Sequence, residues 1–427
     1  MATDLNKSRA LRVCLVLMAI YAGLALRELA GWSLSLGTSE RALSWAVRLA
    51  PENAAYRRTL GRYRLIAQGN PQAAVRELQS SVAHNPFNAD SWFDLARAYQ
   101  IAGDSARQEA AVLRAAAAEP TRPDVAWEAG NFFLIHGENE RALREFSIVL
   151  ANDALSAERV LPMCWRITHD VDTLVNGAIP PVPDIYLRFI EFLNSQKDDE
   201  SAAKVWSALL QLHQPFEPRR ALEYVKHLLL RGDSEAASRA WQQMAPLSGL
   251  SSYLAEQNLI VNPKFELDIL NEGFDWHYLK KPYITLQLDP NEFTKGSRSL
   301  SIQFDGHGVN DIGVSQFIPL KPDASYDFSA YFKTEGMEGA GGPRFVIQDA
   351  YSENILYQSD DLLHEASWHQ VFGRFQVPPG IKLGVLRILR IPAGNAIRGR
   401  LWVDDFSLTE TTNADTTRSE NSNGGQS

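Results

Sequence analysis

The sequence predicts a multi-domain α plus β protein with an N-terminal membrane helix, an α-solenoid of helix-turn-helix repeats and a C-terminal antiparallel β-sandwich. Three observations support this prediction: an apolar run near the N-terminus, amphipathic segments that recur with a fixed period, and a final stretch of short alternating segments. The length of 427 residues allows two or three domains. A formal net charge of −9 excludes a strongly basic surface and argues against nonspecific nucleic-acid binding.

Residues 1–37 contain the signal for cellular location. Three basic residues precede an uncharged run over residues 13–26, and an arginine–glutamate pair follows it. A spanning helix needs about 20 apolar residues, so this length favours a cleaved signal segment. Residues 27–37 nevertheless extend the apolar character, so we expect an uncleaved anchor in a bacterial inner membrane. The basic flank then keeps the N-terminus in the cytoplasm and most of the chain in the periplasm. Secretion after cleavage, or a buried soluble helix, is the alternative.

Residues 38–247 show apolar residues at helical spacing and a regular punctuation by proline. Pro51, Pro86 and Pro120 lie 35 and 34 residues apart. A period of this size is typical of stacked helical repeats, in which each unit buries its apolar face against its neighbours.

Two segments define the repeating unit. "SWFDLARAYQIAGD" (91–104) and "AWEAGNFFLIHGENERALREF" (126–146) place large, small and aromatic residues in a shared order. This order resembles the tetratricopeptide repeat, in which small residues at the crossing let two helices approach closely. The agreement is strong over 54–150 and weaker over 183–247, and the proline-rich stretch 176–184 interrupts the period.

The resemblance implies a groove that receives a protein partner along the inner face of each first helix. The residues aligned with that face are cationic or aromatic, a composition that suits an acidic or aromatic-bearing segment because arginine pairs with carboxylates and stacks on rings. A solvated face without a partner is the alternative interpretation. The positions are Arg58, Arg62, Phe93, Arg97, Trp127 and Asn131.

After a linker at 248–257, residues 258–410 change to short alternating runs separated by glycine and proline turns. The runs begin with "ITLQLD" (284–289) and end with "LWVDDFSL" (401–408), and they predict an antiparallel sandwich. Residues 411–427 are expected to form a disordered tail.

Several segments in this half resemble carbohydrate-binding modules of the galactose-binding-like jelly-roll type. They include "NLIVNPKFE" (258–266), "FIPLKPDASYDFSAYFKT" (317–334) and "RLWVDDFSL" (400–408), in the matching order. The resemblance implies glycan binding, although a jelly roll that has lost sugar recognition remains the alternative. Sugar rings stack on aromatic side chains, and the candidates are Trp276, Tyr278, Tyr283, Tyr351 and Tyr357.

Asp404 raises a question of charge burial. Strand alternation places it on one face with Trp402, Phe406 and Leu408. Burying a carboxylate there costs free energy unless a cation or hydrogen-bond donors compensate. The resemblance implies a structural Ca²⁺ held by Glu266 with Asp404 or Asp405, because calcium prefers oxygen ligands. An arginine or backbone amides are the alternative partners.

The sequence predicts no enzyme. It contains no HExxH, phosphate-loop, GxSxG or dinucleotide motif. Adjacent acids such as those at 404–405 point to opposite faces of a strand, so they cannot flank one glycosidic bond. The resulting hypothesis is a membrane-anchored envelope scaffold in polysaccharide export or assembly, which binds a protein through its repeats and a glycan through its jelly roll. The alternative is a purely protein–protein adaptor.

Overall fold

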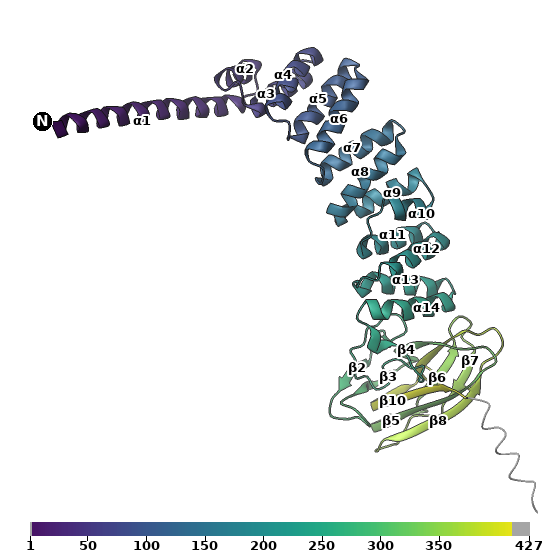
Figure 1. Ribbon diagram of the computed structural model, residues 1–427. Coiled ribbons are helices and arrows are strands. Elements are labelled where there is room, and N and C mark those ends of the chain that lie inside the picture. Colours follow the sequence, from purple (N-terminus) through teal and green to yellow (C-terminus); the bar gives the residue numbers. More distant parts are fainter. Residues whose placement is uncertain (1, 412–427) are drawn as a thin grey trace, which may run out of the picture. The chain divides into compact units, whose positions relative to one another are not determined.

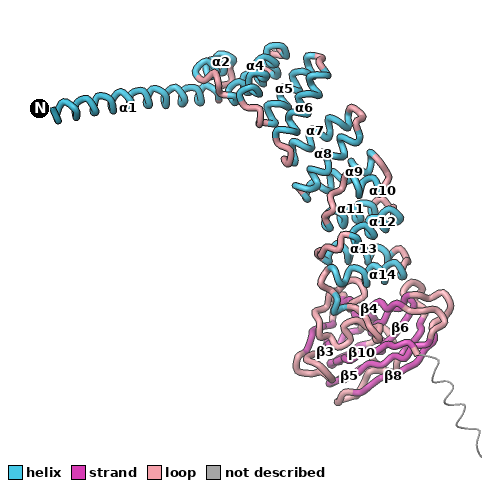
Figure 2. The backbone as a smooth tube through the Cα atoms, viewed as in Figure 1, coloured by secondary structure: helices cyan, strands magenta, loops and turns pink. Residues whose placement is uncertain are grey.

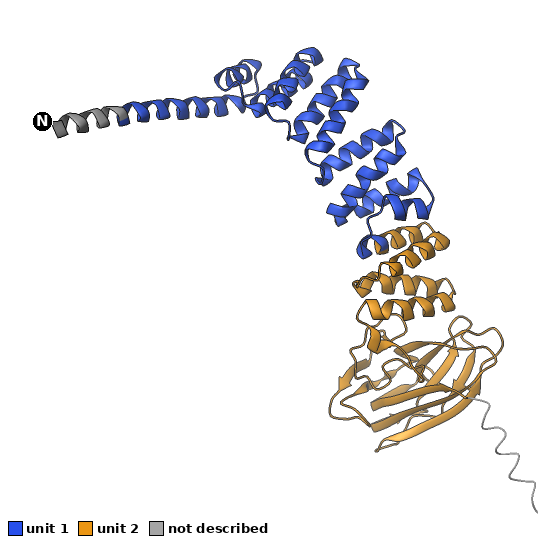
Figure 3. Ribbon diagram, in the orientation of Figure 1, with its two compact units in different colours: residues 1–186 blue, residues 187–427 orange. Residues whose placement is uncertain are grey.

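A computed structural model describes the backbone of residues 2–411 and the side chains of residues 14–411 (Figure 1). In this part of the chain, helices α1–α14 precede strands β1–β10, which confirms the predicted fold class (Figure 2). All but the first residue of the tail expected at 411–427 lie outside the described residues. The chain divides into two compact units, residues 1–186 and 187–427, next to the proline-rich stretch 176–184 (Figure 3).

The first unit is helical, and paired helices follow the period of the sequence. Asn53 and Asn88, which are 35 residues apart, both cap the first helix of a pair by accepting backbone N–H groups. The helices are α1 (Ala2–Ser35), α2 (Glu40–Leu49), α3 (Ala54–Ile66), α4 (Pro71–His84), α5 (Ala89–Ala102), α6 (Ser105–Ala118), α7 (Pro123–Ile135), α8 (Asn139–Asn152), α9 (Ala157–Ile167) and α10 (Val171–Gly177).

The helix crossings explain the small residues of the repeat. A Cβ built on Gly61 would lie 2.7 Å from Leu78 Cγ in the partner helix, and one on Gly130 would lie 2.7 Å from Phe146 Cε1. A larger residue at either position would have to push the two helices apart. The expectation that small residues let the two helices of a repeat approach closely is therefore confirmed at these two crossings.

Helix α1 contains the apolar N-terminal run and contacts the first repeat near its C-terminal end. Its segment Cys14–Ser35 is long and apolar enough to cross a membrane, by length and composition, and a signal sequence would have the same properties. At its C-terminal end, a Cβ on Gly31 would lie 3.2 Å from the ring of Tyr56 in α3. The end of α1 therefore packs on the first repeat.

The second unit begins with helical pairs and ends with the sandwich. Ala202 and Ala237, which are 35 residues apart, are fully buried at corresponding positions of the last two pairs. The helices are α11 (Pro183–Ser195), α12 (Asp199–Gln211), α13 (Pro218–Leu230) and α14 (Ser234–Met244). Short 3-10 turns at Ala245–Leu247 and Ser251–Tyr253 lead toward the strands.

The sandwich consists of two five-stranded antiparallel sheets, with strand orders β1-β4-β9-β6-β7 and β2-β3-β10-β5-β8. Aromatic residues such as Phe328, Phe345 and Phe406 contact one another in the core between them. The strands are β1 (His277–Tyr278), β2 (Ile284–Asp289), β3 (Ser299–Gly308), β4 (Asp311–Pro319), β5 (Ser325–Gly339), β6 (Pro343–Asp349), β7 (Ile355–Gln358), β8 (His369–Gln376), β9 (Leu383–Arg390) and β10 (Ala396–Glu410).

An irregularity in β10 corrects the expected strand face. The pairing of β10 with β5 shifts register after Asp404, where Asp405 has a φ of +47°. This bulge turns Phe406 into the core, so Phe406 lies among the core residues with Val403. Asp404 therefore does not share a face with Phe406 and Leu408, because the extra residue reverses the alternation.

Candidate functional site

The arginines predicted for the repeat groove converge on a buried acid, Asp94 of α5. The Nε of Arg58 donates to Asp94 Oδ2 at 2.5 Å. Arg62 and Arg97 lie 3.9 and 3.6 Å from the same carboxylate. Sequence reasoning missed Asp94, although its position one helical turn from Arg97 was a signal for such a pair.

A second acid, Asp90, pairs with Arg122, and the hydrogen bond from that arginine lowers the pKa of Asp90 below its ordinary value. Arg97 also lies 3.3 Å from Glu128, whose pKa burial raises above its ordinary value despite that arginine. The predicted groove is therefore internally neutralised, and its arginines are not unpaired cations waiting for an acidic segment.

Three of the predicted groove residues nevertheless line one pocket. Phe93, Arg97 and Asn131 border a cavity of about 260 Å³ between α5, α6 and α7, together with the exposed Ile135. Trp127 lies outside this lining, with its ring 5.6 Å from Phe146 and the guanidinium of Arg159 4.1 Å above it. The groove combines apolar surface with paired charges.

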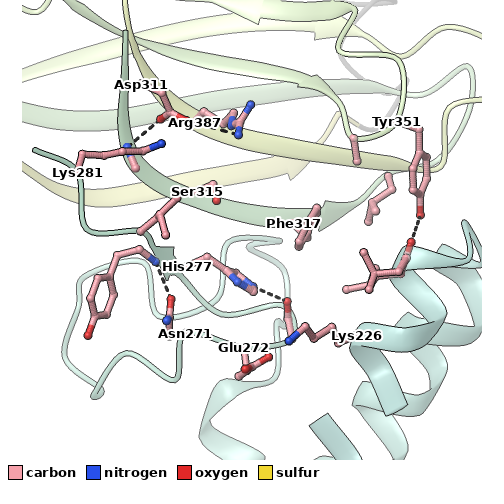
Figure 4. A pocket seen from close by; sticks show the side chains of 18 residues that line it. Lys226, Asn271, Glu272, His277, Lys281, Asp311, Ser315, Phe317, Tyr351 and Arg387 are labelled. Carbon is pink, nitrogen blue, oxygen red and sulfur yellow. Dashed lines mark hydrogen bonds and ion pairs between the residues drawn. The ribbon is translucent and has the colours of Figure 1, made fainter. Parts of the chain in front are cut away.

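A larger pocket, of about 640 Å³, lies in the second unit between α13 and the outer face of the first sheet (Figure 4). Helix α13 forms one wall, strands β4 and β9 form the opposite wall, and β1 with the loops on either side of it closes a third side. The residues named in the figure are Lys226, Asn271, Glu272, His277, Lys281, Asp311, Ser315, Phe317, Tyr351 and Arg387.

Hydrogen bonds fix the groups around this pocket. The hydroxyl of Tyr351 donates to the carbonyl of Leu229 at 3.1 Å, which joins the loop after β6 to α13. The Nε2–H of His277 donates to Gly273 O at 2.9 Å, and burial lowers the pKa of His277 below its ordinary value. The backbone N–H of Tyr278 donates to Asn271 Oδ1 at 2.7 Å. The pocket walls are therefore held in place by bonds between separate elements.

Helix α14 packs on the same sheet face beside the pocket. Leu383 and Val385 of β9 alternate with core residues and point outward, yet both are buried and lie outside the sandwich core. Lys382 Nζ lies 2.8 Å from Glu235 Oε1 of α14, next to these residues. The pocket is thus an opening left where the last helical pair packs on the sheet.

The structure separates the five predicted glycan-binding aromatics. Tyr278 and Tyr351 both line the large pocket, with 49% and 52% of their surface exposed. Tyr283 is equally exposed but stacks on His307, with ring centroids 4.0 Å apart, and Tyr357 packs on Phe328 and lines a different pocket of about 440 Å³.

Trp276 requires a correction. Its ring is only 1% exposed and packs against Phe265 and Phe406, and its indole N–H donates to Asn262 O at 3.0 Å. It therefore has no open face for a sugar. Sequence alternation did not predict this burial, because Trp276 lies in a loop just before a two-residue strand and is covered in part by Phe406 of the last strand.

The charge of Asp404 is compensated by Thr294. Asp404 Oδ2 accepts both the backbone N–H and the hydroxyl of Thr294, each at 2.7 Å, and Oδ1 accepts the N–H of Asp405 at 2.8 Å. Burial still raises the pKa of Asp404 above its ordinary value, because these bonds offset only part of the desolvation.

The other two predicted calcium ligands also have partners. Glu266 accepts the N–H and hydroxyl of Ser297 at 2.7 and 2.6 Å, and Asp405 lies 3.8 Å from Lys264 and 3.6 Å from Lys295. Among the side chains that the structure describes, no group of three or more His, Cys, Asp or Glu is arranged to hold a metal ion. This arrangement does not fit a shared calcium ion, which stays a prediction from the resemblance.

Comparison with known proteins agrees with the two kinds of structure in the chain. A family model described as tetratricopeptide repeat matches residues 77–110, which include α5. No curated protein sequence matches the chain. The helical pairs and the two-sheet antiparallel sandwich of the structure confirm the fold that both resemblances predicted.

Similar solved structures fall into the same two kinds. A crystal structure of MamA is 16% identical, and the match covers 40% of this chain and 85% of that one, with a TM-score of 0.25. A CBM4 structure is 13% identical over 36% of this chain and 99% of that one (TM-score 0.27), and module 2 of carbohydrate-binding family 16 is 20% identical over 36% and 100% (TM-score 0.26). Likenesses of this size carry no inference about ligands.

Proposed function

We propose that this protein is a non-enzymatic, membrane-anchored scaffold of the bacterial envelope, with repeats that bind a protein partner and a sandwich that binds a glycan during polysaccharide export or assembly. The observation that carries the glycan part is the pocket between α13 and the first sheet. It combines two half-exposed tyrosines with several hydrogen-bonding side chains around one cavity. Sugars present apolar ring faces and many hydroxyl groups, so a glycan site needs both features.

The pocket is also preorganised. The bond from the Tyr351 hydroxyl to α13 holds that ring, and the bond from the backbone N–H of Tyr278 to Asn271 holds the strand that carries the second tyrosine, before a ligand arrives. Less conformational entropy is then lost on binding. Arg387 lies 3.5 Å from Asp311 on the pocket wall, so their charges cancel. The arginine can donate a hydrogen bond to one sugar hydroxyl and the aspartate can accept one from another.

The test measures oligosaccharide binding by the full chain in detergent, first on a glycan array and then by calorimetry with the glycans that bind. We expect Tyr278→Ala and Tyr351→Ala to reduce affinity by tenfold or more, on the order of 1–2 kcal/mol per lost ring contact. Tyr283→Ala is the matched control, since Tyr283 is 50% exposed but does not line the pocket. Absence of glycan binding, or binding unaffected by both pocket variants, would favour the protein–protein adaptor instead.

For the repeats, the internal ion pairs change the partner expected from the sequence. A segment that binds the groove has to offer apolar side chains to Phe93 and Ile135. Its own charged groups need to displace only some of the existing arginine–carboxylate pairs. A photo-crosslinker at position 135 tests this in cell envelopes. A partner captured there and lost in Phe132→Ala, whose partly exposed ring lines the same pocket, supports the groove, whereas equal capture in the variant argues against it.

Membrane anchoring is supported by the continuity of α1. The candidate span Cys14–Ser35 and the contact of Gly31 with the first repeat belong to one unbroken helix, and Gly31 lies near the C-terminal end of that span. A tether with no intervening linker favours retention of the helix, with its basic flank in the cytoplasm. N-terminal sequencing of membrane-extracted protein decides between the alternatives: a mature start near residue 26 would make the protein secreted or periplasmic and soluble.

A further inference from the structure

Helix α2 exposes a face that the repeat array does not use. Leu43 and Ala46 of this helix are buried, whereas Arg41, Trp45 and Arg48 are exposed. Spacings of four and three residues place the last three side chains on one side of the helix. They are called the α2 face below.

The arginines of the α2 face differ from those that follow. Among residues 14–411, no ion pair joins Arg41 or Arg48 to an acid, whereas Arg57, Arg58 and Arg64 of α3 all pair with carboxylates. The guanidinium of Arg48 instead lies 5.1 Å from the centre of the Trp45 ring. The face therefore presents two uncompensated positive charges beside an exposed indole.

The course of the chain places this face beside the end of the candidate span. Only four residues, 36–39, connect α1 to α2, and the two helices contact each other (Figure 1). Such a short connection turns α2 back along α1. The ring of Tyr56, which follows α2 in the sequence, contacts Gly31 of α1. The chain after α2 therefore lies beside that glycine. Trp45 and Arg48 lie in the second half of α2 and so are placed beside the last turns of α1, a few residues beyond the apolar run 13–26.

The last turns of α1, beside α2, also expose apolar side chains. Leu29, Trp32 and Leu36 follow the Arg27–Glu28 pair at spacings of three and four residues, and all three are more than half exposed. Tryptophan concentrates where hydrocarbon meets the headgroup layer of a membrane, and arginine extends from apolar surface toward phosphate groups. The hairpin of α1 and α2 thus shows the composition of a membrane interface.

We propose that the α2 face binds the phospholipid headgroup layer where the span leaves the membrane, with Arg41 and Arg48 pairing with lipid phosphates and Trp45 inserted at the interface. The proposal rests on the proposed anchor and adds a second contact to it. Positive charges close to an anionic lipid surface strengthen binding to it. The first repeat is then fixed on the membrane surface, not merely tethered to it.

The experiment uses the full chain reconstituted into vesicles of phosphatidylethanolamine and phosphatidylglycerol whose acyl chains are brominated near the headgroups, which quenches nearby tryptophan fluorescence. Trp32 lies on the span itself, so Trp32→Phe is the background. We expect clear quenching in this background and its loss when Trp45→Phe is added. Trp127→Phe, in the third repeat, is the matched control and leaves quenching unchanged. Arg41→Ser with Arg48→Ser lowers the quenching while Trp45 is retained.

Flotation of the same vesicles reports the anchor separately. A chain that floats with the vesicles, but whose quenching does not depend on Trp45, overturns the lipid contact and leaves the anchor intact. A chain that does not float overturns both. Equal quenching in vesicles of zwitterionic phosphatidylcholine alone contradicts the role assigned to the two arginines, and the expected result is weaker quenching there.

Discussion

Asp275 gives a prediction that can be worked out in detail. This residue lies in the loop before β1 and is fully buried. Its Oδ2 accepts the backbone N–H of Leu270 at 2.7 Å, and its Oδ1 has no hydrogen-bond partner among the described residues. Burial raises the pKa of Asp275 from 3.8 to about 6. The loop also contributes residues to the wall of the large pocket.

The raised pKa means that the folded state holds the proton more tightly than the unfolded chain does. Below pH 3.8 both states are protonated, and the buried carboxyl is neutral. As the pH rises from 3.8 to about 6, the unfolded chain releases its proton first, so the free energy of unfolding falls. Above about pH 6 the full cost is present, about 3 kcal/mol at 1.36 kcal/mol for each pKa unit. This acid therefore destabilises the protein at neutral pH.

Asp275→Asn removes this cost because the amide oxygen can still accept from Leu270 and never ionises. We expect the variant to be more stable than the wild type at pH 7.5, by up to about 3 kcal/mol, which corresponds to several degrees in melting temperature. The advantage shrinks toward pH 4. The assay compares thermal melts of the full chain and the variant in detergent from pH 4 to 7.5, and the difference between them cancels the other titrating groups.

The matched control is Asp268→Asn, since the side chain of Asp268 is 96% exposed in the same segment. Its effect should stay within about 0.5 kcal/mol at every pH. A difference between Asp275→Asn and wild type that does not change with pH would refute the assignment of the burial cost to Asp275. The amide NH2 introduced by Asp275→Asn would replace an oxygen that has no partner, which lowers the stability of the variant equally at every pH, so the pH dependence of the difference is the quantity that tests the assignment.

The remaining predictions concern packing and Asp404. Gly130→Leu should lower stability by roughly 1–3 kcal/mol through overpacking against the partner helix. Gly177 has open space around it, so Gly177→Ala should change stability by less than about 1 kcal/mol. Equal melting temperatures for the two variants would mean that the repeat is misaligned. Thr294→Val removes the hydroxyl donor of Asp404 and should cost about 1–3 kcal/mol, while Thr294→Ser retains most of the stability, as urea titration would measure. Melts in calcium and in chelator separate the two explanations of the buried acid: a lower melt in chelator, abolished by Asp404→Asn, supports the calcium site, and identical melts leave the threonine as the partner.

The helical half was predictable from the sequence because its determinants are local. Gly61 and Gly130 recur at helix crossings, and spacing along one helix shows which side is buried. The pairing of Arg58 with Asp94 was not predictable in the same way. It joins two helices that are neighbours only after the repeats stack, and the same residue types on isolated helices indicate nothing more than a polar face.

The sandwich shows where alternation fails as a guide. Its strands follow the expected period, but one extra residue at Asp405 reverses the faces of β10 beyond it. A bulge of this kind depends on a single residue with positive φ, which sequence alone does not reveal for an aspartate. The burial of Trp276 was missed for a different reason: it follows a loop with no periodic pattern, and it is covered by Phe265 from the start of that loop and by Phe406 from the last strand.

The large pocket could not be predicted from either half of the chain alone, because its walls come from a repeat helix and from a sheet of the sandwich. A ligand bound there contacts α13 and the sheet at once. By linkage, such a ligand stabilises the packing of the last helical pair on the sandwich to the extent that it prefers the packed state. The loop from Asn271 to Tyr278 belongs to the same wall and contains the buried Asp275. Ionisation of Asp275 is therefore expected to destabilise the loop that forms this wall, and a ligand bound in the pocket would stabilise the same loop.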